Sequence, residues 1–190
     1  MKKNKKLLIL VALFLAVFAV GGTLAYLTDT GESATNTFTF GKVNISLTEP
    51  TWTTTGSTAA ADTVPGESIA KDPTIKVESD SKNAYVFAKV TIPTGTVGGV
   101  ANQELFTIGT LGSGWVEITS SLSNLAAGVH VYAYGTASAM TSVAKNTTLP
   151  AVFSAIASKS TLTESEIAQL TNRTADVVVN AYEIQADGLT

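Results

Sequence analysis

An unbroken apolar run near the N-terminus divides the chain before any other pattern is considered. Leu7 to Val20 holds 14 consecutive apolar residues and follows four lysines within residues 2–6. A basic segment, a short apolar run and small residues after it are typical of a secretory signal peptide. A membrane span needs roughly 20 apolar residues. We therefore expect a cleavable signal helix over residues 1–25, cut between Ala25 and Tyr26, with an uncleaved anchor as the alternative.

The remaining composition excludes several classes of function. Residues 26–190 carry 8 Lys and Arg against 15 Asp and Glu, a formal charge of −7. Such an acidic chain with dispersed lysines lacks the basic stripe that neutralises phosphates, so we expect no nucleic-acid partner. The absence of cysteine excludes disulfides, cysteine-ligated zinc and thiol catalysis. The 28 threonines among these 165 residues favour β structure.

Two strands have the clearest alternation of apolar and polar residues. Thr74 to Glu78 and Ala84 to Ile92 are separated by the turn-forming Ser79 to Asn83, which predicts a hairpin. In the second strand Val86, Ala88, Val90 and Ile92 share the face that we expect to be buried. Asp176 to Gln185 is apolar on both faces, which predicts a central strand covered on both sides.

The remaining segments include further strands, one helix and two irregular stretches. We expect strands at Thr35 to Thr48, with a bulge at Gly41, at Trp115 to Ser120 and at Val129 to Tyr134. We expect a capping-box helix at Thr163 to Thr171, a strand or helix at Pro150 to Ser158, a loop at Glu49 to Gly66 and mostly irregular chain at Pro93 to Gly114. The sum predicts an all-β fold, a jelly-roll-like β-sandwich with one or two short helices, preceded by the signal helix. The domains expected are a signal peptide at 1–25, an extended segment at 26–35 and a single β-sandwich at 36–190.

Enzymatic motifs are missing. His130 is the only histidine, so no His-Glu-x-x-His zinc pair exists, and no Gly-x-Ser-x-Gly elbow supports a serine triad. Because His130 stands between Val129 and Val131, we interpret it as an ordinary strand histidine. We expect no catalytic, metal-binding or cofactor-binding residue and no cofactor.

Three weaker patterns have structural explanations that we favour. Asp72, Glu78 and Asp80 could offer oxygens to Ca²⁺ without EF-hand spacing, and Lys89 with Asn180 could form an isopeptide cross-link. Aromatic side chains could line a sugar-binding face, although strand aromatics more often pack against each other. The aromatic residues concerned are Trp52, Trp115, Tyr132 and Tyr134.

Three blocks of sequence resemble a known family. They are Gly21 to Asp29 with Ser33 to Val43, then Asp72 to Val77 with Asn83 to Val90, and finally Ala181 to Gly188. The chain resembles the TasA/camelysin family of exported bacterial proteins, and the first block is similar to signals cut by the SipW-type signal peptidase of Gram-positive bacteria. The middle of the chain, Pro93 to Ala175, matches only in general layout.

The resemblance implies a secreted structural protein of the extracellular matrix or cell surface, a subunit of biofilm-matrix fibres. It implies donor-strand complementation, in which the N-terminal segment of one copy completes the sheet of the next, with a minor matrix or anchor protein as a further partner. The alternatives are a camelysin-like secreted metallopeptidase, which the single histidine argues against, and a surface module that binds a ligand. The residues that we assign to the inter-subunit strand are Tyr26, Leu27, Thr28, Asp29, Thr30, Gly31, Glu32, Ser33, Ala34 and Thr35.

Overall fold

The fold is all-β and antiparallel, as the sequence predicts. A computed structural model describes residues 42–188. The strands in chain order are β1 (Ile45–Thr48), β2 (Ser68–Ala70), β3 (Thr74–Val77), β4 (Ala84–Thr91), β5 (Thr94–Val97), β6 (Val100–Glu104), β7 (Phe106–Ile108), β8 (Trp115–Glu117), β9 (Val129–Tyr134), β10 (Thr147–Thr148), β11 (Ala155–Ser158) and β12 (Val178–Gln185). The helical elements are η1 (Trp52–Gly56), α2 (Ser57–Ala60), η2 (Thr119–Ser121), α3 (Glu164–Ile167) and η3 (Thr171–Arg173).

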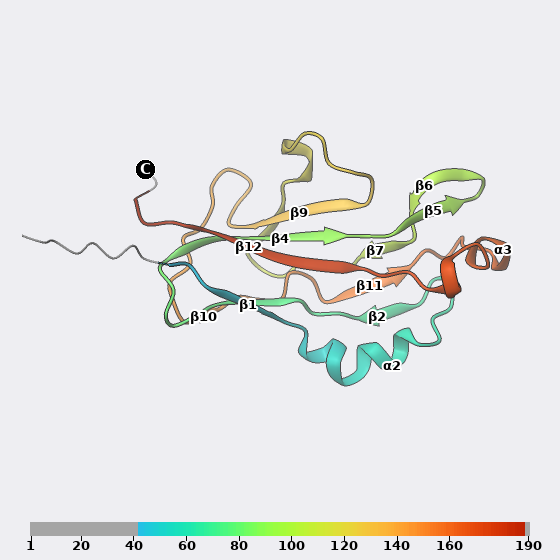
Figure 1. The fold of residues 1–190 in the computed structure, drawn as a ribbon, viewed down its shortest axis with the longest axis horizontal. Coiled ribbons are helices and arrows are strands. Elements are labelled where there is room, and N and C mark those ends of the chain that lie inside the picture. The colour runs from blue at the N-terminus through green and yellow to red at the C-terminus, as the bar shows by residue number, and fades with distance from the viewer. Residues whose placement is uncertain (1–41, 189–190) are drawn as a thin grey trace, which may run out of the picture. The chain divides into compact units, whose positions relative to one another are not determined.

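Within residues 42–188 the strands form four sheets (Figure 1). The largest has the order β12-β4-β9-β8, and two three-stranded sheets have the orders β1-β3-β10 and β2-β11-β7. The hairpin β5-β6 forms the fourth. Side chains from the three larger sheets meet in one apolar cluster, which makes the domain a sandwich. The strand connectivity specific to a jelly roll stays a prediction.

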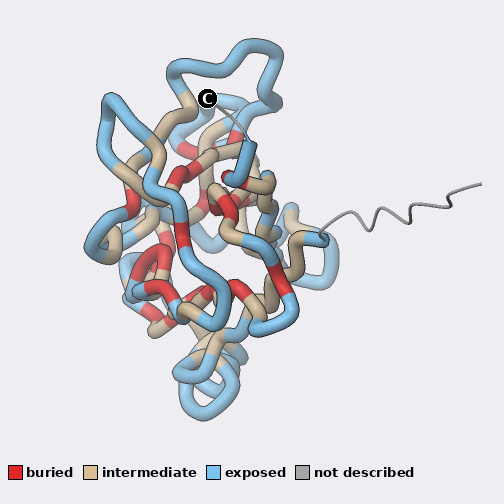
Figure 2. Tube along the Cα trace, turned by 90° about the vertical axis from the view of Figure 1, so that its left-hand side faces the viewer, coloured by how far each residue is buried: buried red, intermediate tan, exposed pale blue. Residues whose placement is uncertain are grey.

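The core lies on one face of β4. Ala84, Val86, Ala88 and Val90 are fully buried, while the intervening residues are only half-buried. The alternation that predicted this face is confirmed, and Ile75 and Val77 of β3 are buried in the same cluster. In Figure 2 the buried stretches of the trace lie inside, and most connecting loops are exposed. Burial on one face fixes the register, because a one-residue slip would turn every apolar side chain outward.

The predicted hairpin between Thr74 to Glu78 and Ala84 to Ile92 is wrong. Both strands exist, but β3 pairs with β1 and β10, whereas β4 pairs with β12 and β9. The turn between them bonds to the chain before β1 instead: the Lys82 amide donates to the Lys42 carbonyl at 3.0 Å, and the Asn44 amide donates to Ser81 Oγ at 3.0 Å. The turn therefore passes from one layer of the sandwich to the other.

The predicted central position of Asp176 to Gln185 is also wrong. β12 is an edge strand, hydrogen-bonded only to β4 among the described strands. Its outward side chains are exposed, including Val178, Tyr182 and Ile184. The apolar side chains on both faces of β12 therefore do not reflect burial on two sides. One face packs in the domain and the other is exposed.

Other predictions have mixed outcomes. The strand at Val129 to Tyr134 and the Thr163/Glu166 capping box are confirmed, and Pro150 to Ser158 contains a strand. The stretch Pro93 to Gly114, expected to be irregular, holds β5, β6 and β7, because glycines at 98 and 99 form the tight turn of a hairpin. The predicted bulge at Gly41 lies outside the described residues.

The predicted loop at Glu49 to Gly66 is largely helical. A continuous helical segment, residues 50–60, contains the π-helical turn η1 followed by α2. The segment begins at Pro50, whose fixed φ suits the first helical turn. It packs closely on β2, since a Cβ added to Gly56 would collide with the Ala70 carbonyl oxygen. Only glycine allows this approach of helix and strand.

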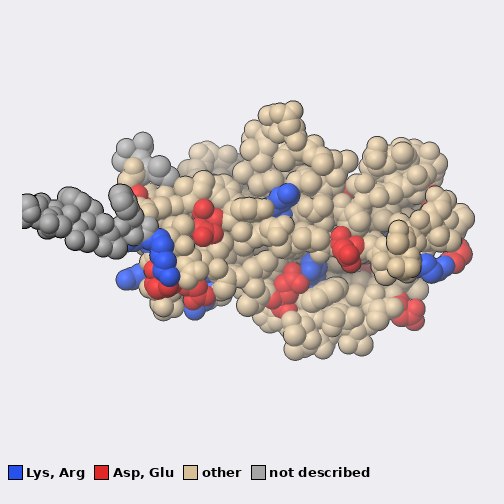
Figure 3. All heavy atoms as spheres, in the orientation of Figure 1, with Lys and Arg blue, Asp and Glu red and all other residues tan. Residues whose placement is uncertain are grey.

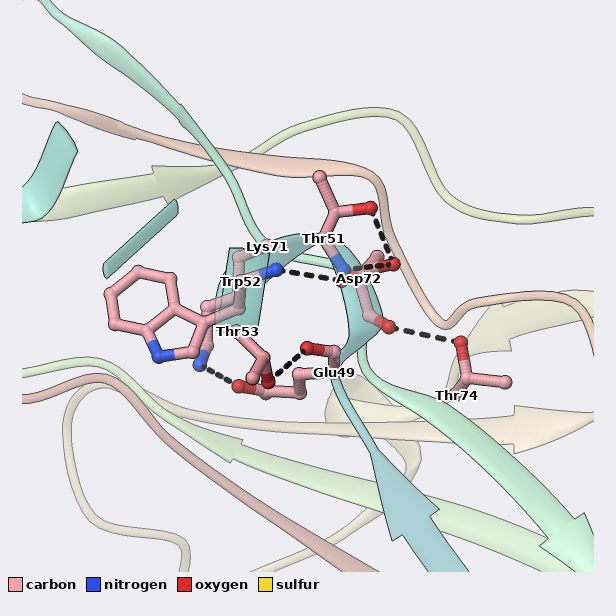
Figure 4. Close-up of polar contacts among 7 residues, drawn as sticks. All are labelled: Glu49, Thr51, Trp52, Thr53, Lys71, Asp72 and Thr74. Carbon is pink, nitrogen blue, oxygen red and sulfur yellow. Dashed lines mark hydrogen bonds and ion pairs between the residues drawn. The ribbon is translucent and has the colours of Figure 1, made fainter. Parts of the chain in front are cut away.

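A carboxylate distant in sequence caps this helical segment (Figure 4). Asp72 accepts hydrogen bonds from the backbone amides of Thr51 at 2.9 Å and Trp52 at 3.2 Å, and from Thr51 Oγ1 at 2.8 Å. Beside it the buried Lys71 Nζ pairs with Glu49 at 2.8 Å and lies 4.5 Å from the centre of the Trp52 ring. These contacts hold the helical segment to the strands, and sequence patterns could not reveal them because the partners are about 20 residues apart.

Replacing the capping carboxylate should weaken the fold measurably. Removing a helix cap costs about 1 kcal/mol, so we expect Asp72→Ala to lower the free energy of unfolding in urea by about that amount. Asp62→Ala, at an exposed carboxylate within the same region, is the matched control and should change little. Equal unfolding free energies for the two variants would contradict the capping role.

Candidate functional site

The residues predicted to join subunits lie outside the described part of the chain. This applies to the cleavage position at Ala25 and Tyr26 and to the whole segment Tyr26 to Thr35. A segment of this kind would need an open strand edge within residues 42–188. The relevant feature is the edge strand β12.

The backbone of β12 has one row of groups without partners among the described residues. The Ala186 amide donates to the carbonyl of Asn83, the residue before β4, at 2.8 Å, so the backbone amide of residue 186 points toward the β4 side. Orientation alternates along an antiparallel strand, so the even-numbered residues 178–184 also face β4. The opposite edge of β4 agrees, since the amides of Ala84 and Ile92 donate away from β12, to Val143 and Gly128. The amides and carbonyls of Val179, Ala181 and Glu183 consequently face outward from the sheet.

The side chains of β12 divide in the same alternation. Val179 and Ala181 pack against the core cluster. Val178, Tyr182 and Ile184 point to the outer face and are 45%, 50% and 51% exposed. Figure 3 shows mostly uncharged surface on the side of the molecule where β12 and β1 run, with the charges in scattered groups. An exposed apolar strand with a free edge is a template for pairing with another chain.

The chain enters the domain near one end of this edge. Lys82 bonds to Lys42 at the start of the described chain, and the neighbouring Asn83 bonds to Ala186 just after β12. β1 then runs close to β12, at the margin of the other layer. Lys42, where the described chain begins, and the end of the free edge therefore lie at the same end of the sandwich.

The carboxylates considered for Ca²⁺ are occupied by separate structural contacts. Asp72 caps the helical segment, Glu78 accepts from Ser46 at 2.6 Å and Lys76 at 2.9 Å, and Asp80 pairs with Lys42 and with Asn44. The hydrogen bonds from Ser46 and Lys76 lower the pKa of Glu78. Within residues 42–188 no three His, Asp or Glu side chains are arranged to hold a metal ion. Nor does any helix of this part combine the length and apolar character needed to cross a membrane.

The four aromatic candidates do not form one exposed face. Trp115 and Tyr132 are buried, and Trp115 Nε1 donates to the Pro150 carbonyl at 2.8 Å. Tyr134 meets Trp115 edge to face, with ring centres 5.5 Å apart. Trp52 lies against Lys71. These aromatic residues pack within the domain, as expected for aromatic residues of strands.

The possible cross-link partners Lys89 and Asn180 do face each other across β4 and β12. Both belong to the solvent-facing side of the sheet, where Asn180 is exposed and Lys89 half-buried. Attack by a lysine amine requires its neutral form, which burial promotes. The position therefore favours a solvated pair over a cross-link.

One polar cluster was missed by sequence reasoning. His130 Nδ1 lies 2.8 Å from Glu117 Oε1, and Nε2 lies 2.9 Å from Glu104 Oε1. Glu117 comes from β8, which pairs with β9, and Glu104 comes from β6, which belongs to the separate β5-β6 hairpin. The cluster therefore depends on contacts between distant strands that alternation alone does not reveal. Since a neutral imidazole has only one N–H, two ionised carboxylates at both nitrogens require the protonated ring. Burial lowers the pKa of His130, but the hydrogen bonds that the ring donates to Glu117 and Glu104 outweigh this effect, and the pKa is raised.

Comparison with known proteins returned no match, whether with family models, curated proteins or solved structures. The resemblance to the TasA/camelysin family stays a prediction.

The His130 cluster should make stability depend on pH. The pKa of His130 is higher in the folded state than its value of about 6.5 in the unfolded chain. Its ion pairs therefore stabilise the fold fully below the unfolded pKa, and this stability is lost as the pH rises through the folded pKa. We expect the difference in unfolding free energy between the protein and His130→Gln to shrink from pH 6 to pH 9, measured in urea. A difference that stays constant across this range would show that the ring is not protonated between the carboxylates.

Proposed function

We propose that the protein is a secreted, non-enzymatic structural subunit that polymerises by donating its N-terminal strand. In this proposal Tyr26 to Thr35 of one copy pairs with the free edge of β12 in the next copy. The observation that carries the proposal is the row of outward amides and carbonyls at Val179, Ala181 and Glu183 on an exposed apolar strand. Donated strands gain affinity from main-chain hydrogen bonds to such an edge.

The lengths of the two partners are compatible. β12 has eight residues, and the proposed donor has ten, residues 26–35. Six further residues, 36–41, precede the described domain and can span at most about 20 Å when extended. This is enough for the donor to leave its own domain, and a head-to-tail contact of this kind generates an open filament when its rotation does not close into a ring.

The donor has few apolar side chains, so main-chain hydrogen bonds would supply most of its binding. Only Tyr26, Leu27 and Ala34 of the donor are apolar, and the rest are small or polar. Val179 and Ala181 of β12, together with partly buried Ile45 and Leu47 of nearby β1, offer apolar surface beside the edge. Tyr26 and Leu27 are the side chains that we assign to this surface.

Export and processing complete the proposal. A SipW-type signal peptidase would cut after Ala25, which frees Tyr26 as the start of the donor. The polymer would lie in the extracellular matrix or on the cell surface, with an accessory matrix or anchor protein as a second partner. Support for this part comes from the signal-like sequence and the family resemblance.

Removing the donor should abolish polymers without unfolding the domain. We expect a chain beginning at Tyr26 to form fibres visible by electron microscopy and a chain beginning at Asn36 to remain monomeric. Near-UV circular dichroism of the two should agree, since the domain core lies outside the deleted segment. Fibres formed by the shorter chain would overturn strand donation.

A single substitution can test the acceptor edge. Proline at position 181 removes an outward amide while leaving the bonds from β12 to β4 in place, and proline is tolerated on such an edge. We expect that the β12 edge of Ala181→Pro no longer accepts a donor strand, so that fibres do not grow, while the monomer keeps a similar melting temperature. Ala181→Val keeps the amide and is the matched control. Normal polymerisation of the Ala181→Pro variant would show that β12 is not the acceptor.

A further inference from the structure

A pocket of about 240 Å³ lies where β6, β7, β8 and β9 meet. Glu104, Glu117, His130 and Tyr132 line its polar side, and Ile92, Ile108 and Leu111 are among the apolar side chains of its wall. The pocket is separate from β12, which pairs on the far side of β4. It takes no part in the proposed polymer contact.

Tyr132 has an unused hydrogen-bonding group at this pocket. The residue is only 2% exposed and lines the pocket, and none of the side-chain hydrogen bonds within residues 42–188 involves its hydroxyl. The hydroxyl oxygen is not sealed off, because no buried side-chain oxygen in this part of the chain lacks a partner. Burial and the carboxylates of Glu117 and Glu104 raise the pKa of Tyr132, so it keeps its proton. A buried phenol that is left open to a pocket is a group available to a ligand.

The carboxylates of Glu104 and Glu117 can also accept further hydrogen bonds. Glu104 uses only Oε1, toward His130, and Glu117 uses only Oε1, toward His130 and Thr119. The second oxygen of each has no partner among residues 42–188. Two carboxylates against one imidazolium leave the cluster with a net negative charge. The free groups are therefore mainly acceptors, and the complementary ligand is a cation rich in N–H donors.

We propose that this pocket binds a primary ammonium group carried on an aliphatic chain. The ammonium would donate to the carboxylates of Glu104 and Glu117 and to the Tyr132 hydroxyl, and the alkyl part would lie against Ile108 and Leu111. The volume is below the 300–1,000 Å³ of typical drug-sized sites, which suits a short alkylamine or a lysine side chain. The inference does not depend on the proposed fibre function.

The ligand must compete with the proton on His130. The groups that face the ring are Glu104 from β6, Glu117 from β8 and Tyr132 from its own strand, whose ring stacks with it at 6.4 Å between centres. A bound ammonium supplies the positive charge that the imidazolium otherwise supplies, so binding favours the neutral ring. Affinity should rise about tenfold per pH unit below the His130 midpoint and level off above it, because an alkylammonium stays charged in this range.

The experiment uses the one histidine of the chain as its reporter. We would follow the His130 imidazole resonance by NMR from pH 5 to pH 10, with n-butylamine or Nα-acetyl-lysine amide added. The expected result is a midpoint that moves to lower pH as ligand is added, while n-butanol has no effect. A response to butylamine alone assigns the site to free amines, and a response to both extends it to lysine side chains. If neither amine moves the midpoint, the proposal is wrong.

Variants separate this site from general attraction to an acidic surface. At a pH where the ring is neutral in all proteins, Glu104→Gln and Glu117→Gln should each weaken butylamine binding about tenfold. Asp62→Asn removes an exposed carboxylate elsewhere and should leave the affinity unchanged. Equal weakening by all three would mean that only net charge matters and would overturn the proposal.

Discussion

The burial of one face of β4 is the constraint on which the rest of the domain depends. β4 is the only strand of the four-stranded sheet that is hydrogen-bonded along most of its length on both sides among the described strands, to β12 and to β9. Its fully buried Ala84, Val86, Ala88 and Val90 fix which way it faces, and pairing passes that orientation to its neighbours. The outward row of β12 and the inward position of His130 both follow from it.

Local pattern predicted which residues form strands but not which strands are partners. The buried face of β4, the limits of β9 and the Thr163 capping box followed from alternation and spacing of neighbouring residues. The hairpin of β3 with β4 was wrong because the hydrogen bonds from the turn to Lys42 and Asn44 lead the chain into the other layer. The helical segment at residues 50–60 was missed because its cap, Asp72, comes from the strand side of the chain.

The candidate site shows the same limit. Apolar residues on both faces of β12 predict a central strand, because the sequence does not distinguish a face that is buried in the domain from a face that stays exposed on it. The Glu104–His130–Glu117 cluster could not be predicted because β6 belongs to a different sheet from β8 and β9, and the three strands meet only in the folded domain. In each case the missing information is a contact between residues far apart in the chain.

The pairing of β12 with β4 also determines when the sheet can close. Its paired residues are between 87 and 101 positions apart, from Val178 with Thr91 to Gln185 with Ala84. Contacts over such separations form slowly, because the intervening loop must close first. A growing chain that has not yet reached residue 178 cannot cover that side of β4. The four-stranded sheet can therefore be completed only after residues 178–185 have been synthesised, so one side of β4 stays uncovered until the end of the chain is made.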